Sequence, residues 1–219
     1  MISFCTWIYN RLHQYRRVIE TNLERSDDFD AEFVLLDFGS TDGLVEYVQS
    51  LAQPRIKLVR REFSQEGFHF AKLYNAAIRE SSWSIVVTLD ADNLIGIDYC
   101  QWCLNKVDDG RWLWAWDGNY RSGTCGRIAC TRADFERLGG YDENLGPIGY
   151  QDLDLIARAK AMGMHVHETR RVGVVGGAIM NDREDTCRAL GWESYRQCNT
   201  ANANRSKTNI LMGKLVANQ

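Results

Sequence analysis

The feature that most constrains the fold is an alternation of apolar segments of strand length with segments whose apolar residues recur at helical spacing. Asp37 and Asp90 each end one of the strand-length segments. Such an alternation favours an α/β class with a parallel, Rossmann-like sheet, whose ligands bind beyond the carboxyl ends of the strands. Strands are expected at 2–9, 32–39, 56–61 and 83–92, and helices at 11–24, 41–52 and 68–81.

The second half of the chain departs from this alternation. The 219 residues suffice for one well-cored domain. We therefore expect a single domain over residues 1–219, with a seam near residue 110 between two lobes. Here helices are expected at 97–107, 133–143, 150–163 and within 182–206, and strands at 111–120, 123–132 and 165–177.

Composition excludes several classes of protein. The net charge of −3 offers no basic surface for nucleic acid. No segment approaches the roughly 20 apolar residues that span a bilayer, and no signal peptide is recognisable. The seven cysteines are odd in number and scattered, which favours a reduced, cytoplasmic protein, although work beside a membrane stays open. The lack of GxGxxG, Walker A and HExxH motifs counts against dehydrogenases, P-loop NTPases and zincins.

Acidic residues follow two of the predicted strands. In DFGSTDG (37–43), Asp37 ends a strand and Gly39 permits a sharp turn, although a plain cap at Thr41 or Asp42 is equally consistent with the pattern. In LDADN, Asp90 and Asp92 follow the apolar run IVVTL. Two carboxylates two residues apart on an extended chain point the same way and repel each other. This pair therefore predicts a hard cation or a polar ligand at the strand end, although a helix cap beside a surface acid is the plainer interpretation of the tripeptide alone.

A third acidic segment, GYQDLDL (149–155), begins a predicted helix. Asp152 and Asp154 lie in its first turn, where a negative charge is favoured by the helix dipole alone.

Together, the segments DFGSTDG, LDADN and GRIACTRADFERLGGYDENLGPIGYQDLDL resemble, in this order, the GT-A fold nucleotide-sugar glycosyltransferases. More narrowly, the chain is similar to glycosyltransferase family two with a galactosyltransferase-like C-terminal motif, GGYDE followed by G-[YW]-x-[EQ]-D-x-D-L. The resemblance implies a mixed, mostly parallel sheet flanked by helices. It also implies a nucleotide-binding half at 1–109 and an acceptor-binding half at 110–219.

The resemblance further implies roles for individual residues. Asp152 matches the catalytic base that takes a proton from the acceptor hydroxyl, and Asp92 the main ligand of Mn²⁺ or Mg²⁺, with Asp90 beside it. Direct attack by that hydroxyl would invert the anomeric centre. The positions that match nucleotide contacts are Thr6, Tyr9, Asn10, Asp37 (which would read uracil), His69, Lys72 and Asp90.

Two departures from the family pattern stand out. Gln151 occupies a position where the family often has Glu, so that it could orient an acceptor hydroxyl but carry no charge. Asn181 aligns with a late histidine that often binds the metal. His165 and His167 come earlier on a predicted strand, where residues at a surface are the plainer interpretation.

Weaker signals have ordinary interpretations as well. Cys100 and Cys103 form a lone CxxC on a predicted helix, for which core packing is favoured over zinc. Core packing is also the default for the stripe of aromatic residues, with a sugar-stacking platform as the alternative. The stripe consists of Trp112, Trp114, Trp116 and Tyr120, and the arginines that could meet phosphate are Arg121, Arg127 and Arg132.

The sequence therefore predicts an inverting, metal-dependent hexosyl- or N-acetylhexosaminyltransferase. It would move a sugar from a UDP-sugar to a hydroxyl of a saccharide or lipid-linked acceptor. One alternative is an inactive nucleotide- or carbohydrate-binding module, which Gln151 and the missing histidine would allow. A sugar nucleotidyltransferase would need an N-terminal glycine-rich loop that CTWIYNRLHQY lacks. The chain could also be one lobe of a larger enzyme.

Overall fold

The structure is a computed structural model in which one sheet runs through both halves of the chain. It describes residues 1–64, 67–108, 110–119, 123–170, 175–178, 184, 187–188 and 190–219. Within these residues the sheet has seven strands in the order β3-β2-β1-β4-β7-β6-β8. The strands are β1 (Ile2–Ile8), β2 (Ala31–Asp37), β3 (Ile56–Arg60), β4 (Ile85–Thr88), β6 (Arg111–Ala115), β7 (Ile128–Thr131) and β8 (His165–Thr169).

The sheet is mixed but mostly parallel, which confirms the expected α/β fold class. β2 and β4 pair with β1 in parallel, β3 pairs with β2 in parallel, and β7 is antiparallel to β4 and β6. Because β7 runs against β4, its first residue Ile128 pairs with Thr88, the last residue of β4. The segment that precedes β7 therefore reaches the same edge as the carboxyl ends of β1, β2 and β4.

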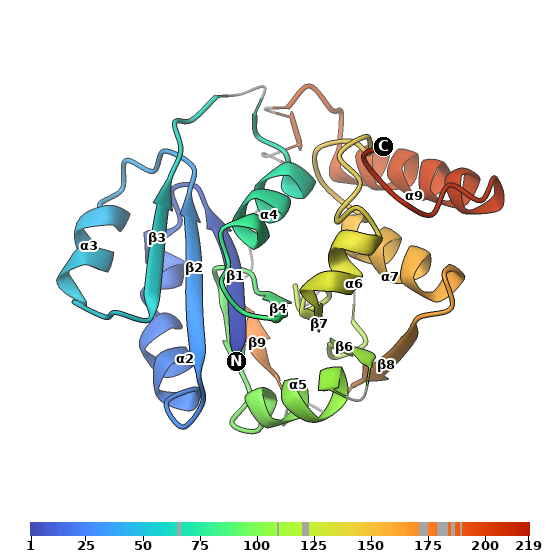
Figure 1. Cartoon of the computed structure of the whole chain (residues 1–219). Coiled ribbons are helices and arrows are strands. Elements are labelled where there is room, and N and C mark those ends of the chain that lie inside the picture. The colour runs from blue at the N-terminus through green and yellow to red at the C-terminus, as the bar shows by residue number, and fades with distance from the viewer. Residues whose placement is uncertain are drawn as a thin grey trace.

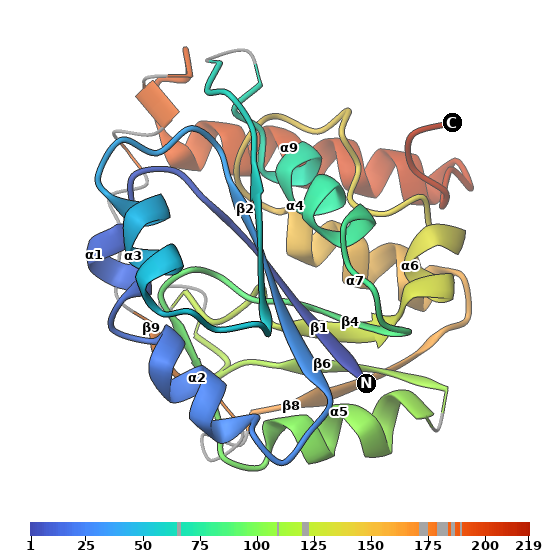
Figure 2. The same cartoon turned by 60° about the vertical axis from the view of Figure 1, so that its left-hand side comes forward.

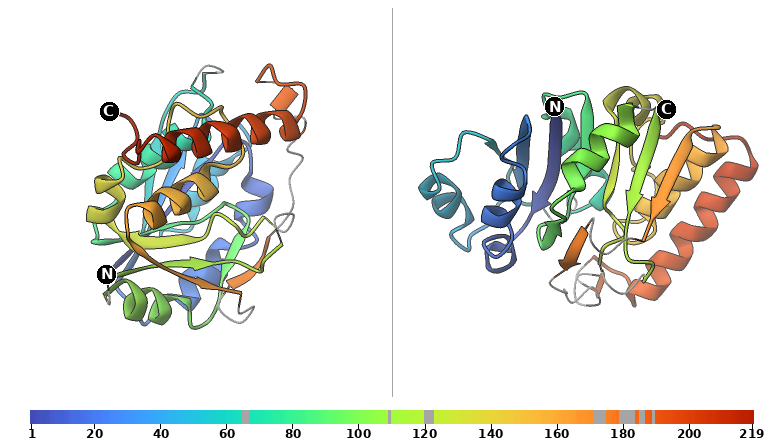
Figure 3. Two further views of the ribbon diagram at one scale, coloured as in Figure 1. Left: turned by 90° about the vertical axis from the view of Figure 1, so that its right-hand side faces the viewer. Right: turned by 90° about the horizontal axis from the view of Figure 1, so that it is seen from below.

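Helices cover both faces of this sheet (Figures 1 and 2). One face is covered by α2 (Ile19–Arg25), α3 (Leu44–Ser50) and α5 (Tyr99–Asp108), and the other by α4 (Phe70–Arg79), α6 (Arg132–Arg137) and α7 (Gln151–Ala161). The last long helix, α9 (Tyr195–Leu211), lies on the outside of α7 (Figure 3).

Each face of the sheet has its own apolar core, because successive side chains of a strand point to opposite faces. In β6, Leu113 faces the core under α5, whereas Trp112 and Trp114 face the core under α4 and α7, which Trp116 joins just after the strand. These three tryptophans are at most 4% exposed. They therefore pack in the core as the default predicted, and the sugar-stacking alternative is wrong for them.

Several predicted elements differ from the structure in their division or bounds. The expected helix 11–24 is divided into α1 (Leu12–Tyr15) and α2, with tight turns between them. The strand expected at 83–92 ends at Thr88, and a short strand, β5 (Asn93–Ile95), follows. The strand expected at 165–177 is likewise two, β8 and β9 (Val175–Ala178), of which β9 pairs with β5. Within the last predicted helix, Glu184, Cys187 and Arg188 are helical among the described residues, and α9 runs from Tyr195 to Leu211, beyond the expected end.

Candidate active site

The first two acids of the site lie in a tight turn after β4. The amide of Asn93 donates to the carbonyl of Asp90 at 3.0 Å, so the DAD segment is a turn and not the extended chain that the sequence suggested. The turn still places the two carboxylates close together. Burial, with the charge of Asp90 next, raises the pKa of the Asp92 carboxyl to about 6. A cation beside Asp92 would relieve both effects.

Asp152 reaches the same place from the other half of the chain. It lies in the first turn of α7. A Cβ atom placed on Gly126 would be 3.4 Å from Oδ2 of Asp152 and 3.5 Å from Oδ2 of Asp90. The backbone of Gly126 is held there by a hydrogen bond from the Thr88 hydroxyl to its carbonyl. Two acids 62 positions apart thus converge on one glycine that leaves space between them.

Two tyrosine hydroxyls complete the hydrogen bonding of these acids. Tyr74 donates to Oδ1 of Asp90 at 2.6 Å, and Tyr141 donates to Oδ1 of Asp152 at 3.1 Å. Burial raises the pKa of both phenols well above its ordinary value, so both remain protonated donors. The sequence showed Tyr74 only as an apolar helix position and Tyr141 only as part of GGYDE, and no local pattern reveals where a hydroxyl points.

Two arginines face the acids. Arg127 is fully buried, and burial lowers the pKa of its guanidinium, while Tyr99 and the carboxylates of Asp90 and Asp92 act in the opposite direction. Burial also lowers the pKa of Arg11, while the charges of the same two carboxylates act to raise it. The site therefore combines carboxylates with positive charge. Such a lining suits a ligand that carries both a cation and phosphate groups.

The residues expected to contact the nucleotide lie along the carboxyl edge of β1 and β2. Thr6 is buried and donates to the carbonyl of Leu89 at 2.7 Å, which ties β1 to the loop of the acids. Asn10 adopts a left-handed conformation, and its Oδ1 accepts from the amide of Thr41 at 2.8 Å. The ring of Tyr9 stacks on Phe63 with centroids 4.3 Å apart.

Asp37 lies at the end of β2 and is fully buried. Its Oδ1 accepts from the amide of Ser40 at 2.8 Å, and its Oδ2 lies 3.2 Å from Nε of Arg60. Its neighbour Asp42 does not cap α3, whose N-cap is Gly43, but instead accepts from the amide of Leu12 at 2.8 Å.

An open hollow of about 570 Å³ adjoins Asn10 at this edge. Two arginines and one histidine outnumber its single carboxylate, which suits an anionic ligand. Its lining consists of Asn10, Leu12, His13, Arg16, Arg17 and Asp42.

Two further predicted contacts lie at the start of α4. Nε2 of His69 lies 3.0 Å from the carbonyl of Leu145, an acceptor only, so this nitrogen carries the proton. Burial lowers the pKa of His69, which keeps the ring neutral at pH 7. Lys72 is exposed. Gln151 is buried and donates to the carbonyl of Gly146 at 2.8 Å, so its amide nitrogen holds the loop before α7.

The remaining candidate residues lie outside the described residues or make contacts away from the three acids. Asn181 lies outside the described residues, as do Tyr120 and Arg121. His165 is exposed on β8, and His167 lies beside Trp102. The thiols of Cys100 and Cys103 are free and fully buried in the core, as expected. Arg132 donates to the carbonyl of Ile78 in the last turn of α4 and to that of Ser81 just after this helix.

The residues present fit a divalent cation with oxygen ligands. Within the part of the chain that the structure describes, no three side chains of His, Cys, Asp or Glu converge on one point. Magnesium sites commonly use one or two carboxylates together with substrate phosphates and water. The charge of Asp90 helps to raise the pKa of the Asp92 carboxyl, and a cation bound beside the two carboxylates would offset this repulsion.

Comparison with known proteins decides the family. Residues 3–132 match the family described as Glycosyl transferase family 2. The chain belongs to this family. Residues 111–175 of this glycosyltransferase also match the family described as the N-terminal domain of galactosyltransferase. No curated protein sequence matches the chain.

Solved structures show that the fold is that of GT-A glycosyltransferases. The mannosyltransferase PcManGT from Pyrobaculum calidifontis, in complex with GDP-Man and Mn²⁺, aligns with a TM-score of 0.68 and 21% identity over 98% of this chain and 68% of that one. TarS 1-349 of S. aureus, in complex with UDP-GlcNAc, aligns with a TM-score of 0.66 and 14% identity over 86% and 64%. This glycosyltransferase chain thus spans about two thirds of the length of both structures.

In the described residues of this glycosyltransferase, no helix is both long and apolar enough to cross a bilayer.

Proposed function

We propose that this glycosyltransferase moves a sugar from a UDP-sugar to an acceptor hydroxyl with inversion at the anomeric carbon. The observation that carries the proposal is the convergence of Asp90 and Asp152 on Gly126, with a Cβ position 3.4–3.5 Å from both carboxylates. One acid belongs to the turn that would hold the diphosphate, and the other belongs to α7. In an inverting transfer, the base acts on one face of the anomeric carbon and the diphosphate leaves from the other face. One acid is needed for each of these two tasks.

Asp152 is the proposed base. Its carboxylate faces the space beside Gly126 and accepts a hydrogen bond from Tyr141, which fixes its orientation. It would take the proton of the acceptor hydroxyl as the oxygen attacks the anomeric carbon, and the bond to the diphosphate oxygen would break on the opposite face. General base catalysis of this kind contributes roughly 10²–10⁴-fold to the rate.

Asp90 and Asp92 are the proposed ligands of Mn²⁺ or Mg²⁺. A divalent cation held there would neutralise the charge that develops on the leaving diphosphate. The buried Arg127 and the half-buried Arg11 lie close enough to both carboxylates to act on the same charge. Asn181 remains a proposed further ligand.

The proposed donor is a UDP-sugar, with Asp37 reading the uracil. A carboxylate has about four acceptor positions, and each oxygen of Asp37 uses one, but the side chain is fully buried, so contact with uracil requires the surrounding loop to move. The structural relatives support a nucleotide-sugar donor, since one was solved with GDP-Man and the other with UDP-GlcNAc. The acceptor we propose is a saccharide or lipid-linked hydroxyl, and not nucleic acid.

The test is UDP or GDP release from a panel of UDP- and GDP-sugars, with Mn²⁺ and with EDTA. We expect slow hydrolysis of one UDP-sugar that is lost in EDTA. Asp152→Asn should keep binding of UDP and Mn²⁺ by calorimetry and lose at least about 100-fold in release rate. Asp92→Ala should lose the metal-dependent part of UDP binding.

Three outcomes would change the proposal. Release from a GDP-sugar alone would overturn the role of Asp37 in reading uracil. Undiminished release in EDTA would overturn the metal dependence. Tight UDP binding without release from any donor, even with added saccharide acceptors, would favour the inactive binding module.

A further inference from the structure

The loop between the two motifs of the second half carries the proposed base. It runs from Gly139 in GGYDE to Tyr150, the N-cap residue of α7. Its two ends meet in the site, since the hydroxyl of Tyr141 donates to Asp152. Among the described residues, no helix or strand lies between α6, which ends at Arg137, and α7, which begins at Gln151. The shape of the loop must therefore come from contacts with other segments.

Asn202 of α9 holds the second part of this loop. The side chain is 2% exposed. Its Oδ1 accepts from the amide of Gly146 at 2.6 Å. Its Nδ2 contacts three carbonyl oxygens, those of Gly149 at 2.7 Å, Gly146 at 3.2 Å and Ile148 at 3.3 Å. An amide is needed here because it is both donor and acceptor.

The same stretch is held from its other side. The carbonyl of Leu145 contacts Nε2 of His69 at 3.0 Å, and that of Pro147 accepts from the amide of Phe70 at 2.9 Å. Each of the five consecutive carbonyls from 145 to 149 therefore has a partner, from α4, α7 or α9. The loop is fixed residue by residue between the start of α4 and the buried face of α9.

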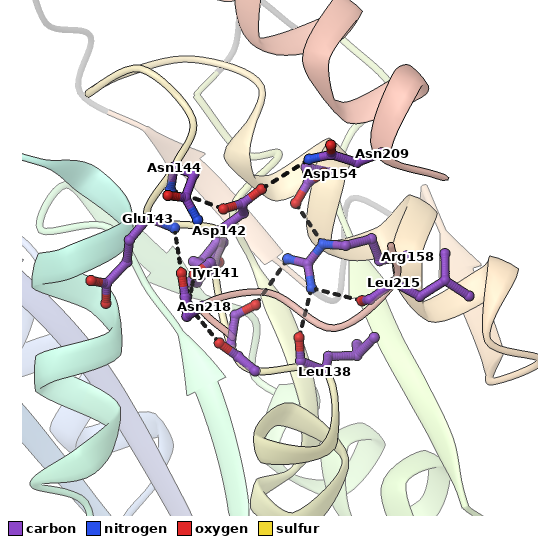
Figure 4. Close-up of polar contacts among 12 residues, drawn as sticks. Leu138, Tyr141, Asp142, Glu143, Asn144, Asp154, Arg158, Asn209, Leu215 and Asn218 are labelled. Carbon is purple, nitrogen blue, oxygen red and sulfur yellow. Dashed lines mark hydrogen bonds and ion pairs between the residues drawn. The ribbon is translucent and has the colours of Figure 1, made fainter. Parts of the chain in front are cut away.

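A second asparagine holds the first part of the loop. Nδ2 of Asn218 donates to the carbonyls of Gly139 at 2.7 Å and Tyr141 at 2.8 Å, and its Oδ1 accepts from the amide of Glu143 at 2.9 Å. Figure 4 shows Asn218 reaching this turn from the segment after α9. Its φ of 60° is a conformation that asparagine tolerates better than most residues.

We propose that Asn202 and Asn218 are positioning residues of the transfer reaction, acting through the loop that places Tyr141 and Asp152. Neither side chain is itself in the site. Both replace backbone partners that the loop lacks, and so decide where the base carboxylate lies relative to Asp90. A misplacement on the order of 1 Å costs about 100-fold in rate. The inference rests on the proposed function of Asp152 as the base.

The test uses one substitution that keeps the shape of the side chain and one that removes the side chain. Asn202→Asp keeps the acceptor for Gly146 but replaces the donor to three carbonyls with a negative charge. Asn218→Gly removes the second side chain and tolerates the left-handed backbone. Asn204→Asp is the matched control, because Asn204 is exposed on the same helix two residues away.

Three quantities are compared for each variant, all below its unfolding temperature: hydrogen exchange of peptides covering 139–153, Kd for UDP with Mn²⁺, and kcat for hydrolysis of the active UDP-sugar. We expect Asn202→Asp and Asn218→Gly to speed exchange in this loop and to lower kcat about tenfold or more, with Kd within about twofold of the wild type. Asn204→Asp should change none of the three.

The outcomes separate the two proposals. Faster exchange with unchanged kcat would overturn the positioning role, and unchanged exchange would overturn the contacts as the source of loop order. A parallel loss of kcat and UDP affinity would mean a general loss of structure and would also overturn it. A wild-type protein that releases UDP from no donor would instead overturn the proposed function.

Discussion

At the scale of single residues, the site holds a carboxylate where burial opposes its charge. Asp92 is 7% exposed, and its pKa is raised from 3.8 to about 6. The folded protein therefore binds a proton at higher pH than the unfolded chain does. The Asp92 carboxyl therefore favours the folded state at low pH relative to neutral pH. This contribution to the free energy of unfolding is lost as the pH rises from about 4 through about 6, so the ionised carboxyl destabilises the folded protein fully at neutral pH.

Asp92→Asn should therefore stabilise the metal-free protein. At pH 7 in EDTA we expect a gain on the order of 2–3 kcal/mol in the free energy of unfolding, which shrinks at pH 4, where the carboxyl is protonated in the folded state and roughly half protonated in the unfolded chain. Urea unfolding at both pH values measures the difference in free energy of unfolding between Asp92→Asn and the wild type. The exposed Asp28→Asn is the control, and equal or lower stability of Asp92→Asn at pH 7 would contradict the argument.

Tyr141→Phe tests the orientation of the base by one hydroxyl. The ring packs against Phe70 and Phe135 and would stay in place. A hydrogen bond to a charged group is worth roughly 1.5–3 kcal/mol, so a loss of about tenfold or more in kcat is expected, with unchanged UDP affinity. Steady-state release of UDP is the measurement, and Tyr47→Phe, which removes a surface hydroxyl bonded to Glu20, is the control. A wild-type kcat would show that Asp152 is oriented without Tyr141.

At the scale of elements, the two acids in the first turn of α7 have different surroundings. Asp152 faces the site, whereas Asp154 is fully buried with its Oδ2 2.7 Å from Nε of Arg158. The guanidinium of Arg158 also donates to the carbonyls of Leu138, Gly140 and Leu215 (Figure 4). Asp154 therefore neutralises the charge that ties α7 to the GGYDE turn.

Asp154→Asn and Asp152→Asn should consequently separate stability from activity on one helix. Removing one partner of a buried ion pair costs roughly 3–5 kcal/mol, so Asp154→Asn should lower the free energy of unfolding by about this amount. Asp152→Asn should change it by less than about 0.5 kcal/mol while abolishing turnover. Thermal and urea unfolding, run beside the UDP release assay, measure both. The reverse pattern would mean that the roles of the two acids are exchanged.

The sequence predicted those elements whose patterns are local. β1, β2 and β4 were visible as apolar runs, and α4 as a helical stripe. The break between α1 and α2 was not, because Leu12, Tyr15, Ile19 and Leu23 keep a helical spacing across it.

The candidate site was predictable in its acids and not in its supports. Asp90, Asp92 and Asp152 stand in recognisable segments. Tyr141 meets Asp152, and Asn202 meets Gly146, only through the fold, so that no spacing along the chain announces them.

At the scale of the whole molecule, the two predicted halves share one sheet and both of its cores. β4 of the first half pairs with β7 of the second. The core under α5 combines Phe4 and Leu35 with Leu113, and the core under α4 combines Val34 with Trp112. The candidate site is divided in the same way, with the proposed cation ligands Asp90 and Asp92 in 1–109 and the proposed base Asp152 in 110–219.

Neither half should therefore fold alone. Fragment 1–109 would expose β4 as an edge strand, together with apolar side chains on both faces of its sheet, and an unpaired edge of this kind promotes aggregation. We expect each fragment, expressed separately, to give narrow amide dispersion in NMR spectra and no UDP binding, with the intact chain as the control. A dispersed spectrum and metal-dependent UDP binding by 1–109 would contradict this, because they would show a nucleotide-binding unit that needs none of the second half. Recovery of both properties on mixing the fragments would agree with it, since each half would then supply the missing side of two shared cores.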